Sequence, residues 1–71
     1  MKEYAVIFEK KPNGWGAYAP DLPGLGAAGD TFEEVEELIR DGMASHIECL
    51  KENGYAIPEP TTRVAVMSTA A

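Results

Sequence analysis

The sequence predicts a single small α+β domain, with elements in the order β-β-β-α-β and an antiparallel sheet covered by one long helix. Two apolar runs flank a Pro-Asn-Gly turn, and a later stretch has helical periodicity between clear start and stop signals. The chain has 71 residues, and we expect one domain over residues 1–71 with its core in about residues 3–67. A chain this short buries only about 60% of its unfolded surface on folding, so oligomerisation is a common source of added stability.

The first two strands are predicted to form a hairpin. Residues 4–8 (YAVIF) are β-branched and aromatic, and residues 15–19 (WGAYA) form the returning strand. The segment KPNG at residues 11–14 is typical of the turn between them, because proline presets φ and Asn-Gly accepts positive φ. Trp15 and Tyr18 point to opposite faces of a regular strand, so one is expected under the helix and the other exposed.

A rigid loop and a short third strand are predicted next. Pro20 ends the second strand, and Pro23 and Gly24 suit the central positions of a type II turn, in which glycine supplies positive φ. Residues 25–28 (LGAA) then predict a strand made of small residues.

The segment GLGAAG at residues 24–29 matches the dinucleotide-binding pattern G-x-G-x-x-G. That pattern requires a buried parallel strand running directly into the glycines and a helix N-terminus inside the motif. Here Pro20 and Pro23 interrupt the chain before the motif, and the predicted helix cap follows Gly29. We therefore interpret the glycines as structural and expect no cofactor.

The helix is predicted from about Thr31 to Asn53. Thr31 is the expected N-cap, and Glu34 completes a capping box three residues later. Asn53 and Gly54 form a typical left-handed stop. Apolar positions recur with the helical period at Phe32, Val35, Ile39, Met43, His46 or Ile47, and Leu50.

An extended segment and a last strand are predicted after the helix. Residues 56–60 (AIPEP) contain two prolines, which exclude helix, and residues 62–67 (TRVAVM) predict the strand. An apolar edge strand near a chain end can pair with a second copy. Val64 and Val66 are therefore the candidate oligomer edge of a homodimer or tetramer.

Composition limits the function classes. The formal net charge of −6 disfavours direct binding to nucleic acid or anionic lipid and suits a basic protein partner. Cys49 is the only cysteine and is expected to be buried or half-buried, and His46, the only histidine, is expected to be packed; neither has metal-site spacing around it. Neither a signal peptide nor an apolar run of about 20 residues is found, so a cytoplasmic location without membrane insertion is expected.

The ordered combination WGAYAPDLPGLGAAGDTFEEVEELI, followed by HIECLKENGYAIPEPT, resembles the HicB-like antitoxin family of bacterial type II toxin–antitoxin systems over about residues 4–66. The resemblance implies a stand-alone N-terminal-type domain with a partial ribonuclease H-like fold. It also implies a partner, a small basic HicA-type toxin that cleaves messenger RNA and whose active site the antitoxin covers. Family members usually add a C-terminal DNA-binding domain, which is not expected in this chain of 71 residues.

Three features supply candidate partner-binding residues: the hairpin aromatics, the rigid loop and the acidic start of the helix. Complementary charge would favour association with a basic toxin. The alternatives are a packed aromatic, a stiff turn and a solvated helix face. The candidates are Trp15, Tyr18, Asp21, Leu22, Glu33, Glu34 and Glu37.

No catalytic residue and no metal ligand is assigned. A metal-dependent nuclease needs several carboxylates that converge, and Asp21, Asp30 and Asp41 fall in a loop, a cap and a helix. We therefore expect a non-enzymatic protein. Two alternatives stay open: an orphan oligomeric scaffold or regulatory domain without a toxin, and an RNA-binding or nuclease domain of related fold.

Overall fold

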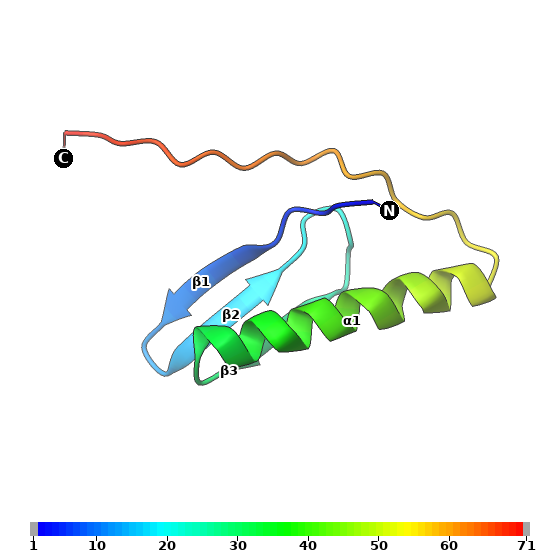
Figure 1. Ribbon diagram of the computed structural model, residues 1–71, viewed down its shortest axis with the longest axis horizontal. Helices are drawn as coiled ribbons and strands as arrows, with labels where there is room; N and C mark the ends of the chain where they lie inside the picture. Colours follow the sequence, from blue (N-terminus) through cyan, green and yellow to red (C-terminus); the bar gives the residue numbers. More distant parts are fainter. Residues whose placement is uncertain (1, 71) are drawn as a thin grey trace.

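A computed structural model describes residues 2–70 and contains three strands followed by one helix (Figure 1). Strands β1 (Ile7–Lys11), β2 (Gly14–Tyr18) and β3 (Gly26–Gly29) form an antiparallel sheet in the order β1-β2-β3. Helix α1 (Phe32–Glu52) packs across β2 and β3 and covers one face of the sheet. The α+β class and the antiparallel sheet covered by one long helix are confirmed.

The β1–β2 hairpin closes at the predicted turn, where Lys11 pairs with Gly14. At its other end Ile7 pairs with Tyr18, so β1 starts three residues later than predicted. The reason lies in the partner strand. The chain turns away soon after Tyr18 because Pro20 has no N–H for a ladder bond, so residues before Ile7 extend past the end of β2.

The core lies between α1 and the sheet. Val35 and Ile39 of α1 are buried against Ala17 of β2. The rings of Phe8 and Trp15 both contact Phe32, with centroid separations of 4.5 and 5.3 Å. Partly buried side chains complete this cluster: Val6, Phe8, Trp15, Leu25, Ala27 and Met43.

The predicted helix ends are confirmed. The side chain of Thr31 accepts a hydrogen bond from the backbone N–H of Glu34 at 3.1 Å, and Asn53 is the C-cap. Gly54 has φ +72°, and the backbone N–H of Tyr55 donates to the carbonyl of Leu50 at 2.9 Å. This is the pattern of a Schellman motif, which satisfies carbonyls that the helix end leaves open.

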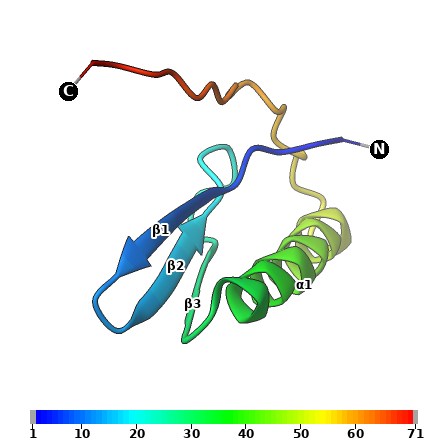
Figure 2. The same ribbon diagram turned by 60° about the vertical axis from the view of Figure 1, so that its left-hand side comes forward.

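The predicted strand over residues 62–67 does not join the sheet. Within residues 2–70 the strands are β1, β2 and β3 alone, and the last residues run as an extended segment away from the body (Figures 1 and 2). Val66 is 97% exposed and Met67 is 85% exposed. A strand needs a neighbouring edge to pair with, and in a single copy this segment diverges from β1. The fifth predicted element is therefore extended but unpaired.

Candidate functional site

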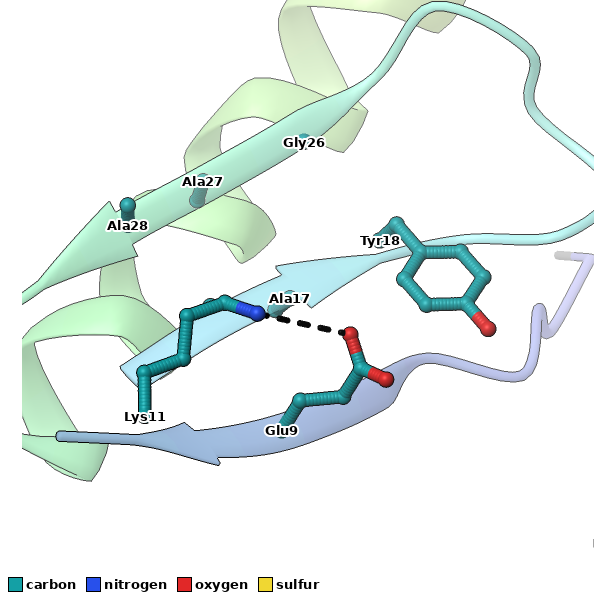
Figure 3. Close-up of a pocket in the computed structure, with 8 residues that line it drawn as sticks. Glu9, Lys11, Ala17, Tyr18, Gly26, Ala27 and Ala28 are labelled. Carbon is teal, nitrogen blue, oxygen red and sulfur yellow. Dashed lines mark ion pairs between the residues drawn. The ribbon is translucent and has the colours of Figure 1, made fainter. Parts of the chain in front are cut away.

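The face of the sheet opposite α1 is an open, shallow depression (Figure 3). Gly16 of β2 and Gly26 and Ala28 of β3 have little or no side chain, and Tyr18 rises beside them with 44% of its surface exposed. This confirms that Trp15 and Tyr18 point to opposite faces, with Trp15 on the helix side. We call this surface the outer face; it is an open depression of about 470 Å³, and its lining is Glu9, Lys11, Gly16, Ala17, Tyr18, Gly26, Ala27 and Ala28.

Two charged side chains border the outer face on β1. The ammonium of Lys11 lies 3.9 Å from the carboxylate of Glu9, and more than half of each side chain is exposed. An ion pair this exposed contributes little to stability, at most about 1 kcal/mol. Both groups therefore stay available to a partner at low energetic cost.

The acidic start of α1 lies on a different side of the molecule. The carboxylate of Glu34 accepts a hydrogen bond from the backbone N–H of Asp30 at 3.2 Å, so Glu34 belongs to the helix cap. Glu33 and Glu37 are exposed. Trp15 is nearby because it packs on Phe32, and the Lys10 ammonium lies 5.6 Å from the Trp15 ring centroid, within cation–π range.

Asp21 forms an internal clamp that the sequence did not reveal. One carboxylate oxygen accepts the backbone N–H groups of Thr61 and Thr62, each at 2.9 Å. The other oxygen accepts both threonine hydroxyls, at 3.1 and 2.9 Å. The backbone N–H of Thr62 is the largest cause, and the remaining three donors also contribute, in holding the pKa of Asp21 below its ordinary value of 3.8.

The candidate residues do not gather on one surface. Tyr18 lies on the outer face, while Trp15 of β2 packs on the opposite face against Phe32, next to the glutamates at the start of α1. Leu22 is completely buried, so its side chain anchors the loop from within and is corrected from a partner contact to a core residue. Its apolar character between two prolines is compatible with either role, and only the tertiary packing distinguishes them.

The residues of the outer face beside Tyr18 were not among the candidates chosen from the sequence. Glu9 and Lys11 alternate along β1, and Gly16 precedes Tyr18 by two residues on β2. Period-two spacing along the strands was the available signal. To use that signal, one must know which residues pair across neighbouring strands, and the sequence alone does not specify this register.

The lone cysteine and histidine show no shared chemistry. Cys49 is exposed, which corrects the expectation of burial, and the side-chain amide of Asn53 lies 3.5 Å from its sulfur. His46 is half-buried on α1.

Among residues 2–70, no cluster of three or more His, Cys, Asp or Glu side chains is placed to hold a metal ion. Within the same residues, no helix combines the length and apolar character that a bilayer span requires.

A family model and two curated relatives match most of the chain. A family model described as the HicB-like antitoxin of bacterial toxin–antitoxin systems matches residues 4–70. Antitoxin HicB 2 of Photorhabdus laumondii subsp. laumondii is 33% identical over 60 residues, which are 84% of this chain and 43% of that protein. UPF0150 protein ssr1765 of Synechocystis sp. is 33% identical over 66 residues, which are 92% of this chain and 84% of that protein. The chain thus spans less than half the length of the Photorhabdus relative.

Two solved structures are similar in fold and sequence. A chain of the HicA3 and HicB3 toxin–antitoxin complex is 32% identical with a TM-score of 0.70, and the match covers 84% of this chain and 70% of that one. The structure of antitoxin HicB3 is 33% identical with a TM-score of 0.65, over 80% of this chain and 42% of that one.

The clamp should open in acid. Because the pKa of Asp21 is lower in the folded chain than its ordinary value of 3.8, its stabilising effect is present above that pH and is lost as the pH falls through the folded-state pKa. We expect the backbone amide resonances of Thr61 and Thr62 to shift together below pH 3.8 in an NMR titration. Asp21→Asn should displace both resonances already at neutral pH, whereas Asp41→Asn should not. If neither acidification nor Asp21→Asn shifts the amide resonances of Thr61 and Thr62, the clamp is contradicted.

Proposed function

The chain belongs to the HicB-like antitoxin family, and on that premise we propose that it binds a HicA-type toxin and blocks its RNA-cleaving active site without catalysing a reaction itself. The observation that carries the proposal is the likeness, in both sequence and fold, to a chain of the HicA3 and HicB3 toxin–antitoxin complex. A toxin that cleaves messenger RNA acts where messenger RNA is translated, so we place the complex in the cytoplasm.

We assign the direct contact to the outer face. A tyrosine that stands beside glycines and alanines offers a large rigid side chain next to space that a partner can fill. Exposed aromatics in such settings often contribute most of the binding energy of an interface. The open surface beside Tyr18 is bordered by Glu9 and Lys11, whose weak ion pair can be exchanged for contacts with a partner (Figure 3).

We assign a second role, electrostatic steering, to the acidic start of α1. The chain carries 12 acidic and six basic residues, and Glu33 and Glu37 are exposed in the first turns of α1. A small basic toxin would be attracted to this charge before contact. Complementary charge raises the association rate and selects the partner, while well-packed contacts set the dissociation rate. The outer face and the helix glutamates therefore have separable effects.

Co-expression tests the proposal as a whole. Only this chain is tagged, and it is produced with the small basic reading frame that neighbours its gene. We expect the small protein to co-purify, and we expect the growth arrest that it causes alone to be relieved. Val35→Asp, which places a charge in the core, is the control that should abolish rescue through unfolding. Absence of both binding and rescue would leave an orphan oligomeric domain as the better interpretation.

Tyr18→Ala tests the assigned contact surface. Removing an aromatic anchor costs about 2 kcal/mol or more, which corresponds to a roughly 30-fold weaker affinity for the toxin. Surface plasmon resonance should show the loss mainly as faster dissociation. Tyr55→Ala is the matched control, because Tyr55 is even more exposed, at 67%, and follows the far end of α1. An equal effect of the two variants would remove the outer face from the proposal.

The paired variant Glu33→Gln/Glu37→Gln tests the steering role. It removes two charges at the start of α1 while keeping the shape of the side chains, and we expect association to slow several-fold at low salt. Glu48→Gln/Glu52→Gln makes the same change in net charge near the end of the same helix and should slow association less. At about 0.5 M salt the difference should vanish, because screening acts over a few ångströms. Identical rates for the two paired variants at low salt would mean that only net charge matters.

A further inference from the structure

The segment that follows the clamp is exposed and apolar. Residues 63–70, which we call the C-terminal arm, run clear of the folded body on the side of β1 (Figures 1 and 2). Val64, Val66 and Met67 are 60%, 97% and 85% exposed. Exposed apolar side chains gathered on one short segment mark an interaction surface. Because the arm is an extended, strand-like segment, a structure that binds it must provide either a groove or the free edge of a β-strand.

The sheet offers such an edge. In the described part of the chain, β1 pairs with β2 on one side only, so its other side presents backbone N–H and C=O groups to solvent. The opposite edge, β3, lies next to α1 and is followed by the helix after two residues (Figure 2). An unpaired edge is a template for a strand from another chain. β1 has five residues, and residues 63–67 of the arm would match that length.

The side chains of the arm match the two faces that β1 presents. Phe8 and Val6, on the helix side, are only partly buried against the core. Val64 and Val66 share one face of an extended arm and would continue this apolar cluster. The other face of the arm then places Arg63 on the side of the sheet that carries Glu9. This match of apolar with apolar and of opposite charges holds for either strand direction.

The Asp21 clamp lies just before the C-terminal arm and bears on whether the arm can pair with its own β1 or with that of a second copy. Thr61 and Thr62 donate four hydrogen bonds to Asp21, and just before them the hydroxyl of Tyr4 donates to the carbonyl of Pro58. The path of the chain is thus fixed up to Thr62, and beyond that residue both views show the arm diverging from its own β1 (Figures 1 and 2). A second copy can bring its β1 edge to the arm with the clamp intact.

We propose that two copies of this chain exchange their C-terminal arms, and that each arm adds as a strand to the free edge of β1 in the other copy. Exchange of identical elements about a two-fold axis closes the assembly at a dimer, because each copy gives one arm and receives one. The exchange covers the exposed valines and the open edge of β1 in one step. It also adds buried apolar surface to a domain whose own core is small.

Solution mass is the first test. Native mass spectrometry and analytical ultracentrifugation of the full chain should give twice the 7.7 kDa of one copy. Val64→Asp/Val66→Asp should give the monomer with unchanged helical circular dichroism, because both side chains are already exposed in one copy. Leu38→Asp is the matched control, since Leu38 is 48% exposed on α1 and should leave the dimer intact. A monomeric wild-type chain, or a dimer that survives the double substitution, would overturn the proposal.

Mixed-label NMR separates exchange from folding of the arm onto its own sheet. A copy with ¹³C-labelled valine methyls is mixed with a deuterated, ¹⁵N-labelled copy. We expect nuclear Overhauser effects between the methyls of Val64 and Val66 in one copy and the amides of Val6 to Phe8 in the other. Contacts found only within one copy, with none between copies, would show that the arm closes its own sheet and would refute the exchange.

Discussion

The domain depends on how closely α1 can approach the sheet. Val35 and Ile39 are buried on Ala17, and burial of such side chains contributes about 1.5–3 kcal/mol each. The approach is close at Gly29, where a Cβ would lie 3.2 Å from Cγ2 of Val35. The small residues on the helix side of the sheet, Ala17 of β2 and Gly29 of β3, therefore allow this packing. The same strands carry Gly16, Gly26 and Ala28 on the opposite side, where they form the outer face.

The loop between β2 and β3 performs two structural tasks with neighbouring residues. Leu22 is buried and fixes the loop to the body, while Asp21 holds Thr61 and Thr62. The same short segment therefore holds the chain at Thr61 and Thr62, where the C-terminal arm begins. From the sequence, Asp21 and Leu22 were candidate partner contacts, with a stiff turn as the alternative. The internal hydrogen bonds of Asp21 and the burial of Leu22 show that this loop positions other segments of the chain.

Local signals determined which elements could be predicted. Thr31 and Gly54 end the helix through contacts with residues only a few positions away. Both ends of the helix were therefore predicted correctly from the sequence. Non-local pairing was not predictable in this way. The start of β1 depends on where β2 ends, and the partners of Asp21 lie 40 and 41 residues away. Alternation predicted that Trp15 and Tyr18 face opposite sides, but only the packing of Phe32 on Trp15 determines which side is the outer face.

The two proposals involve adjoining surfaces and would influence each other. An arm added to β1 extends the sheet beyond Glu9, so Arg63 and Met67 of the other copy would lie beside the outer face. A toxin bound around Tyr18 would then contact residues from both copies. Binding free energies that share such a surface are linked in both directions, so toxin binding would stabilise the dimer by the amount that dimerisation strengthens toxin binding. The acidic start of α1 lies on the other side of the sheet, so its long-range attraction would operate with or without the exchanged arm.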